Sequence, residues 1–201
     1  MGAIAAALAC GLAAGGCGAY LKDAHGNAVS LRGYHVLSID PVEVTDPAAP
    51  AWVGQALGEQ LDKHFPSGKV WVRADALRSE ASGSKTAHAA AGEGTGEPGV
   101  RLKLTVTAAR VCPPGVAGAK LGRAGEECLA EARMDVFDDR SGKLLGSERL
   151  RERRRGTGNG PADEEHFRKV VLCRLSCQAS RVLADARSAS AEWEEHTMGC
   201  G

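Results

Sequence analysis

Cysteine offers this chain its most varied chemistry, because a thiol can bind a metal, attack a substrate or form a disulfide. The sequence has seven cysteines in 201 residues, and five of them lie in the body of the chain: Cys112, Cys128, Cys173, Cys177 and Cys200. The first four of these would suit zinc as thiolates. Neither half of that set has the C-x2-C spacing of zinc ribbons and fingers, so we expect structural disulfides and no metal site.

The spacing of these cysteines indicates how they pair. Cys112 and Cys128 bracket a loop between two strands that we expect to be neighbours, and a bond there would destabilise the unfolded chain by about 3 kcal/mol at that loop length. Cys173 and Cys177 are one helical turn apart and nearly opposite the apolar stripe of their helix, so they face away from the sheet. Because a bond between them would be strained, we expect a covering loop or Cys200 to supply the partner for one of them. One of the five cysteines is then left over.

No catalytic motif appears among the other reactive residues. The histidines are scattered over a strand, a helix end, a loop, a helix start and the tail, as in His35, His64, His88, His166 and His196. The sequence contains no H-E-x-x-H or G-x-S-x-G motif. A Cys–His nucleophile pair would have to form between residues that meet only in the folded chain. We therefore expect no catalytic residues and no cofactor.

Three glycines, Gly94, Gly96 and Gly99, spell G-x-G-x-x-G. A nucleotide-binding loop of this kind needs a buried strand before it and a helix after it. Here a low-complexity stretch comes first, Pro98 interrupts the motif and a strand follows. We interpret the glycines as part of a mobile loop over residues 79–99, which has no large apolar side chain.

Five arginines crowd the end of the last expected strand: Arg149, Arg151, Arg153, Arg154 and Arg155. They could contact anionic lipid headgroups or phosphorylated glycans near a membrane. Alternatively, their charge prevents an exposed strand end from pairing with another chain, and we favour this second interpretation. The chain as a whole has 25 basic and 25 acidic residues, so its charge gives no basis for nucleic-acid binding.

The N-terminal segment has the features of a targeting signal. Residues 3–14 are apolar, and this stretch is too short to cross a bilayer, which takes about 20 residues. Two glycines follow, and then Cys17. The arrangement resembles the lipobox of bacterial lipoproteins, which implies removal of residues 1–16 as a signal peptide and acyl chains such as palmitate on Cys17. A cut before Cys10, or a buried Ala-rich helix of a cytosolic domain, is the alternative.

A lipid on Cys17 implies a protein of the cell envelope. Several acyl chains give stable attachment to the bilayer while the protein body stays soluble. Gly18 stands where lipoproteins retained at the inner membrane have Asp, so the resemblance implies the periplasmic face of the outer membrane. We expect residues 17–30 to form a lipidated tether, and we expect disulfides to persist in this oxidising compartment.

The rest of the chain alternates between strand and helix patterns. Strands are expected at 31–44, 69–75, 101–107, 130–136 and 143–153 from their period-two alternation. Helices are expected from about Trp52 to Phe65 and from Pro161 to about Arg187. The second helix has one apolar face, made of Phe167, Val171, Leu175, Ala179, Val182 and Ala186.

This order of elements predicts the fold class α+β, over residues 31–188, with a tail at 189–201. We expect a two-layer domain with a mainly antiparallel sheet of about five strands and two amphipathic helices. The segments YHVLSIDPVEVTDP, LKLTV and VFDDRSGKLLGS resemble a group of uncharacterised envelope lipoproteins. That group looks related to the α/β domains of the curli-secretion lipoprotein and the amino-terminal domain of the Tol-system propeller protein.

The resemblance implies an envelope location and assembly with other envelope proteins, and it brings no shared catalytic residues. The sequence therefore predicts a non-enzymatic lipoprotein of the outer membrane, held by its acylated cysteine and acting as an interaction or envelope-assembly module. The alternative is a periplasmic enzyme or a Cys-based metal-binding protein.

Overall fold

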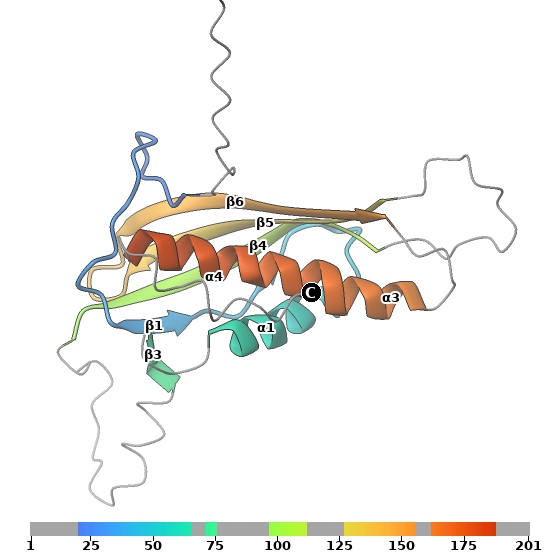
Figure 1. The fold of residues 1–201 in the computed structure, drawn as a ribbon, viewed down its shortest axis with the longest axis horizontal. Helices are drawn as coiled ribbons and strands as arrows, with labels where there is room; N and C mark the ends of the chain where they lie inside the picture. The colour runs from blue at the N-terminus through green and yellow to red at the C-terminus, as the bar shows by residue number, and fades with distance from the viewer. Residues whose placement is uncertain (1–19, 66–70, 76–96, 112–126, 156–161, 188–201) are drawn as a thin grey trace, which may run out of the picture.

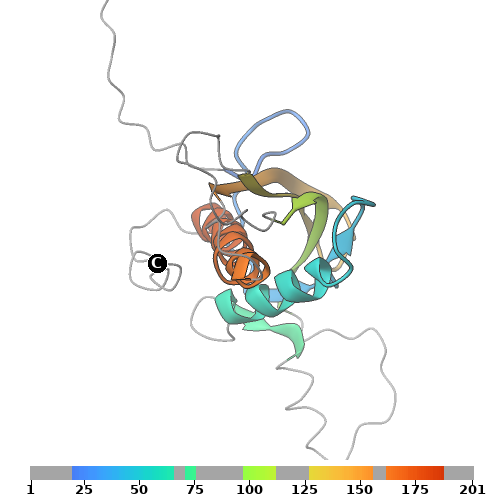
Figure 2. The same ribbon diagram turned by 90° about the vertical axis from the view of Figure 1, so that its right-hand side faces the viewer.

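The computed structural model describes residues 20–65, 71–75, 97–111, 127–155 and 162–187, which form two layers (Figure 1). One layer is a six-stranded sheet in which the strands follow the order β3-β1-β4-β5-β6, with β2 paired to β4. The other layer consists of helices, and the sheet curls around them when the molecule is seen from its end (Figure 2). The predicted α+β two-layer class is confirmed, although part of the sheet is parallel.

The three long strands β4 (Gly99–Arg110), β5 (Glu127–Asp138) and β6 (Leu144–Arg155) form the centre and one edge of the sheet. They pair antiparallel in sequence order, as predicted. Alternate side chains on each strand are buried, and those on β4 and β5 are Val100, Leu102, Leu104, Val106, Ala109, Cys128, Ala130, Ala132, Met134 and Val136. This alternation places the apolar side chains against the helices and leaves a polar open face, the face of β4, β5 and β6 that is turned away from the helices.

The turn between β5 and β6 is held by Asp138. Its carboxylate accepts hydrogen bonds from the backbone N–H and the hydroxyl of Ser141, both at 2.7 Å, and Gly142 has a positive φ of 67°. Tyr34 donates a further hydrogen bond of 3.0 Å to the same carboxylate. The backbone bond from Ser141 is the largest of the causes that lower the pKa of Asp138. Asp138, one of the turn residues predicted from the sequence, therefore also links Tyr34 to the β5–β6 hairpin.

The N-terminal half contributes short parallel strands. β1 (Val36–Ile39) pairs with both β4 and β3 (Val72–Arg73), and β2 (Glu43–Val44) pairs with β4 further along. The sequence predicted one strand over 31–44, but the structure divides it into β1 and β2. Pro41 lies between the two pieces, and its ring nitrogen has no N–H to donate to a ladder. The strand predicted over 69–75 is limited to β3 among the described residues.

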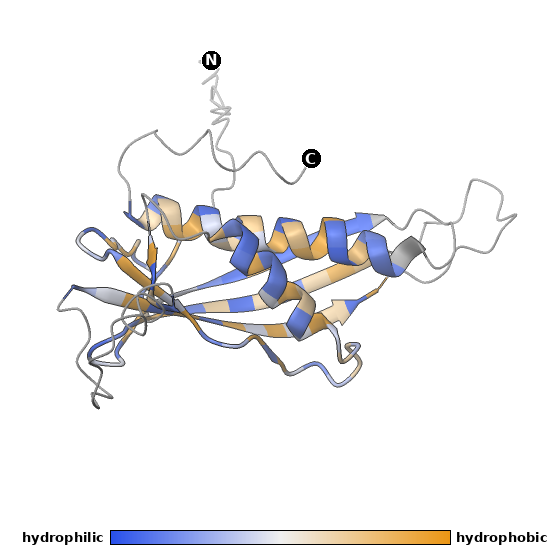
Figure 3. Cartoon of the chain, turned by 90° about the horizontal axis from the view of Figure 1, so that it is seen from below, coloured by the Kyte–Doolittle hydropathy of each residue, from blue (hydrophilic) through white to orange (hydrophobic). Residues whose placement is uncertain are grey.

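Two helical elements cover the inner face of the sheet. α1 (Val53–His64) matches the predicted helix, and the second helix runs through α3 (Ala162–His166), η1 (Phe167–Leu172) and α4 (Cys173–Arg187). The predicted apolar stripe is confirmed, since its members are buried except the partly buried Ala186. Figure 3 shows hydrophobic and hydrophilic bands side by side on both helices. The η1 segment is a π-helix, which the sequence analysis did not predict.

Aromatic contacts join the start of α1 to the second helix. The Trp52 and Phe167 rings lie edge to face with centroids 6.0 Å apart. The Arg168 guanidinium lies over the Trp52 ring, 4.1 Å from its centroid. Such geometries add to the burial of aromatic area, so these contacts help to fix the two helices relative to one another.

Residues 20–31, which we call the N-terminal strap, pack onto the body. Leu21 and Leu31 are buried in the core. Lys22 forms an isolated antiparallel bridge with Ser147 of β6, with N–O distances of 3.2 and 2.8 Å. The sequence predicted a polar tether up to residue 30, but the apolar side chain of Leu21 brings the strap onto the folded domain.

The strap approaches Gly146 so closely that a side chain there would collide with it. A Cβ on Gly146 would lie 2.9 Å from Leu21 Cγ, from the Lys22 carbonyl oxygen and from Val29 Cγ2. This contact explains the glycine at this position of β6, where the register with β5 also shifts.

We predict that Gly146→Ala lowers the free energy of unfolding of the full-length protein by about 1–3 kcal/mol, because the strap must move. Gly58→Ala in α1 is the matched control. A Cβ at Gly58 meets nothing within 4 Å, so this change should raise stability by up to about 1 kcal/mol. Urea unfolding followed by circular dichroism measures both, and equal effects of the two changes would contradict the close approach.

Candidate functional site

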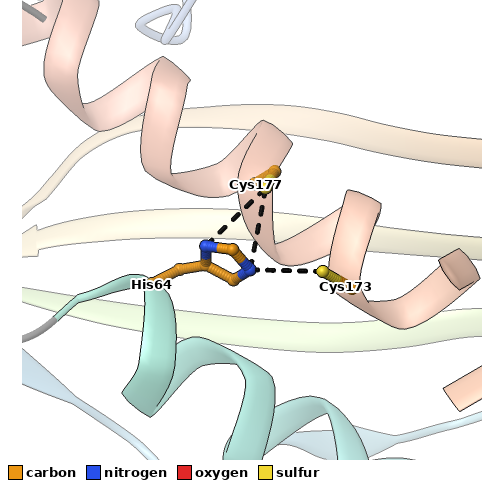
Figure 4. Close-up of side chains that lie close together, drawn as sticks. All are labelled: His64, Cys173 and Cys177. Carbon is orange, nitrogen blue, oxygen red and sulfur yellow. Dashed lines mark hydrogen bonds between the residues drawn. The ribbon is translucent and has the colours of Figure 1, made fainter. Parts of the chain in front are cut away.

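The side chains with the most reactive chemistry meet where the two helices pack together (Figure 4). His64 is the last residue of α1, Cys173 is the first residue of α4, and Cys177 follows one turn later. Cys173 Sγ lies 3.5 Å from His64 Nε2, and Cys177 Sγ lies 3.6 Å from both imidazole nitrogens. We call these three residues the His–Cys cluster.

The cluster gives the two helical cysteines a neighbour that the sequence did not predict. The sequence predicted that Cys173 and Cys177 face away from the sheet, with a covering loop or Cys200 as the partner of one of them. In the structure α1 packs along that face, and the two cysteines are only 8% and 6% exposed. His64 was predicted only as a helix-end residue. Because it lies 109 residues before Cys173, nothing in the local sequence could have predicted the contact.

Burial favours the uncharged forms of His64 and Cys177 at neutral pH. Desolvation lowers the pKa of His64, and the nearby Lys63 charge lowers it further. Desolvation also raises the pKa of the Cys177 thiol, against the smaller opposing effects of Arg181 and Arg174. A cysteine nucleophile works as a thiolate, commonly stabilised by a protonated histidine. Both shifts here oppose that ion pair, so the geometry favours a neutral thiol beside a neutral imidazole.

The same three side chains form a set of metal-binding donors. Their ligand atoms all lie within 4.8 Å of one another, and they are the one such group among the described residues. Two thiolates and an imidazole are donors that zinc takes, and neutral histidine is the form that binds metal. Cys173 is disulfide-bonded, however, and a disulfide sulfur is not a thiolate ligand. The cluster could therefore hold zinc only after reduction of Cys173.

Of the other cysteines in the body of the chain, Cys128 is described, whereas Cys112 and Cys200 are not. Cys128, fully buried near the start of β5, is disulfide-bonded, as is Cys173. Cys112 and Cys200 lie outside the described residues, so the predicted Cys112–Cys128 pairing and the role of Cys200 stay predictions. The alternative zinc site made of Cys112, Cys128, Cys173 and Cys177 is not the group of donors seen here, because His64 stands beside the two helical cysteines and Cys128 does not.

The four arginines of β6 whose side chains are described are divided between its two faces. Arg149, Arg151 and Arg153 are exposed on the open face. Arg154 is on the other face and pairs with Glu152 at 2.7 Å. The side chain of Arg155 lies outside the described residues. Since β6 is an edge strand, the interpretation that its charge opposes edge pairing stays open.

The predicted anchor Cys17 and the signal segment before it lie outside the described residues. Among the residues that are described, no helix has both the length and the apolar character needed to cross a membrane.

The chain matches no family model and no curated protein. Among solved structures it is similar to PelC from Paraburkholderia phytofirmans, solved as a dodecamer, with 13% identity and a TM-score of 0.43 over 77% of this chain and 91% of that one. It is also similar to protein XCC0632 from Xanthomonas campestris, with 10% identity and a TM-score of 0.48 over 83% of this chain and 91% of that one.

A putative lipoprotein from Caulobacter crescentus is a third similar structure, with 16% identity and a TM-score of 0.34 over 74% of this chain and 86% of that one. Lipoproteins from Neisseria meningitidis and Acinetobacter baumannii are also among the similar structures. The resemblance to the curli-secretion lipoprotein and the Tol propeller protein stays a prediction. At these low identities, no function passes from the similar proteins to this chain.

We predict that Cys177 reacts slowly with alkylating reagents in the native protein. At neutral pH its reaction with iodoacetamide should be at least about tenfold slower than in the urea-unfolded chain, because burial raises the thiol pKa and excludes the reagent. The native rate should still be rising above about pH 8.5, the ordinary thiol pKa. Mass spectrometry of the Cys177 peptide measures both rates, and fast labelling of the native protein at neutral pH would show an activated thiolate instead.

Proposed function

We propose that this chain is a lipid-anchored, non-enzymatic lipoprotein of the bacterial outer membrane, whose body faces the periplasm as an interaction or envelope-assembly module. The observation that carries this proposal is the short step from the lipobox to the folded domain. Cys17 precedes the buried Leu21 by four residues, so an acylated Cys17 would hold the body directly at the bilayer surface. Apolar residues 3–14 and the two glycines before Cys17 supply the signal that this modification needs.

The state of the His–Cys cluster supports a non-catalytic role. Cys177 and His64 form a thiol–imidazole pair of the kind used in nucleophilic chemistry. Burial raises the pKa of Cys177 and lowers the pKa of His64, which disfavours the thiolate and imidazolium forms. Cys177 is also only 6% exposed, so a substrate could not reach its sulfur without movement of α1 or α4. Packing between two helices is the role this geometry supports best.

We predict that the chain, expressed in a Gram-negative host, incorporates labelled palmitate and yields an N-terminal peptide that starts at Cys17 with added acyl mass. Cys17→Ser should abolish the label, because the sulfur is the acceptor. Cys10→Ser is the matched control for the rival cleavage position and should leave the label in place. An uncut chain in the cytosol with unacylated Cys17 would refute the proposal.

The second candidate function is metal binding, and the donor set of the His–Cys cluster is the observation that favours it. Its distances of 3.5–3.6 Å between sulfur and nitrogen are close to those between neighbouring ligands of a tetrahedral zinc with Zn–S of about 2.3 Å and Zn–N of about 2.0 Å. The disulfide at Cys173 opposes this function in an oxidising compartment.

We predict that protein purified without chelator or reductant contains no stoichiometric zinc, because Cys173 is not available as a thiolate. Elemental analysis of the full-length protein measures the metal content. The metal-binding function would be favoured instead by stoichiometric zinc that is lost on Cys177→Ser or His64→Gln and retained on His166→Gln, a histidine outside the cluster.

A further inference from the structure

The charges of β6 are sorted by face. Arg149, Arg151 and Arg153 are exposed on the open face, opposite Arg133, Glu131 and Leu129 of β5. The acidic residues of the strand, Glu148 and Glu152, are instead opposite the buried Met134 and Ala130, so they belong to the inner face. Because side chains alternate across a strand, a sequence that alternates Arg and Glu in this way makes one face basic.

The charge of Arg149 is not balanced by any carboxylate among the described residues. Arg149 forms no ion pair with any residue in the described ranges, and its cross-strand neighbour is another arginine, Arg133. Like charges directly opposite one another on a sheet are destabilising. Arg133 pairs with Asp135 at 2.8 Å and Arg151 pairs with Glu131 at 2.6 Å, so these two carboxylates of the open face are already paired with other arginines. This arrangement suits an external anion better than it suits the stability of the sheet.

The N-terminal strap limits how far the predicted anchor can lie from this face. Lys22 bridges Ser147, two positions before Arg149 on the same face of β6. Because that bridge is antiparallel, the described residues just before Lys22, Tyr20 and Leu21, run in the direction of Arg149. Cys17 is five residues before Lys22, a reach of at most about 18 Å for an extended chain. An acylated Cys17 would therefore hold the arginines close to the headgroups, at a range where attraction survives screening over about 8–10 Å.

We propose that the open face of β5 and β6, with Arg133, Arg149, Arg151 and Arg153, lies against the anionic phospholipid headgroups of the membrane that carries the anchor. This inference deepens the proposed function and rests on it for the position of the face. The partner is a phosphate-bearing lipid surface, since the basic side chains are spread over two adjacent strands of an open sheet. Contact on this face would set the orientation of the body, with the helices away from the bilayer.

The test uses full-length Cys17→Ser protein, which cannot be acylated, and vesicles of phosphatidylcholine with or without phosphatidylglycerol. Binding to the neutral vesicles measures what the apolar N-terminal stretch contributes. The partition coefficient for vesicles with phosphatidylglycerol, divided by that for vesicles without it, therefore isolates the electrostatic contribution to binding. We expect this ratio to exceed one and to fall with added salt. Adding Arg149→Gln and Arg153→Gln should reduce the ratio by about tenfold. Arg174→Gln with Arg181→Gln, on α4, is the matched control for the same loss of charge and should leave the ratio almost unchanged.

A second measurement separates binding from folding and from protection of the edge strand. Because Arg149→Gln removes a like-charge neighbour of Arg133, urea unfolding should show equal or greater stability for the variant that binds less. Equal losses of partitioning in the β6 and α4 variants would overturn the proposal, because general charge would then explain the binding. Aggregation of the β6 variant with an unchanged ratio would overturn it in favour of edge protection.

The outcomes also distinguish this inference from the proposed function. Acyl labelling of Cys17 tests the anchor alone, and the vesicle ratio of the Cys17→Ser protein tests the arginine face alone. A labelled Cys17 with a ratio of one would leave the lipoprotein in place and remove the docking surface.

Discussion

The inner faces of β4, β5 and β6 carry a continuous set of apolar side chains that the two helices cover. The stripe that runs from Phe167 to Val182 meets these side chains, and their burial provides the main favourable free energy of the domain. This one-sided burial leaves the other face of the sheet polar, since a face wet by solvent needs no apolar residues. The arginines of β6 can therefore collect on the open face without disturbing the core.

The second helix has a further contact, along α1, that decides the state of the reactive residues. Its apolar stripe faces the sheet, while Cys173 and Cys177 face α1 and meet His64 at its C-terminal end. A helix packed on two sides buries residues that a sequence pattern assigns to an outer face. Desolvation then suppresses the charge of both the thiol and the imidazole. The packing that brings Cys177 and His64 together thus also disfavours the thiolate and imidazolium charges of a nucleophilic pair.

The sequence predicted those parts of the fold whose signal is local. Alternation identified β4, β5 and β6, turn chemistry identified Asp138 to Gly142, and helical periodicity identified the stripe from Phe167. The parallel pairing of β1 with β4 and β3 joins segments far apart in the chain, and periodicity carries no such information. The His–Cys cluster was missed for the same reason. Cys17, Cys112 and Cys200 lie outside the described residues, so the sequence remains the guide to the anchor, to the Cys112–Cys128 bond and to the partner of Cys200.

The π-helical segment Phe167–Leu172 interrupts the regular α-helical spacing of the second helix. A π turn holds about one residue more than an α turn, and each residue of an α-helix rotates the following side chains by about 100°. The wide turn absorbs that extra residue, so Phe167 and Leu175 both reach the core although the helix between them is irregular. An ancestral single-residue insertion would leave this signature. Homologues one residue shorter at this point could carry an unbroken α-helix over the same hydrophobic core.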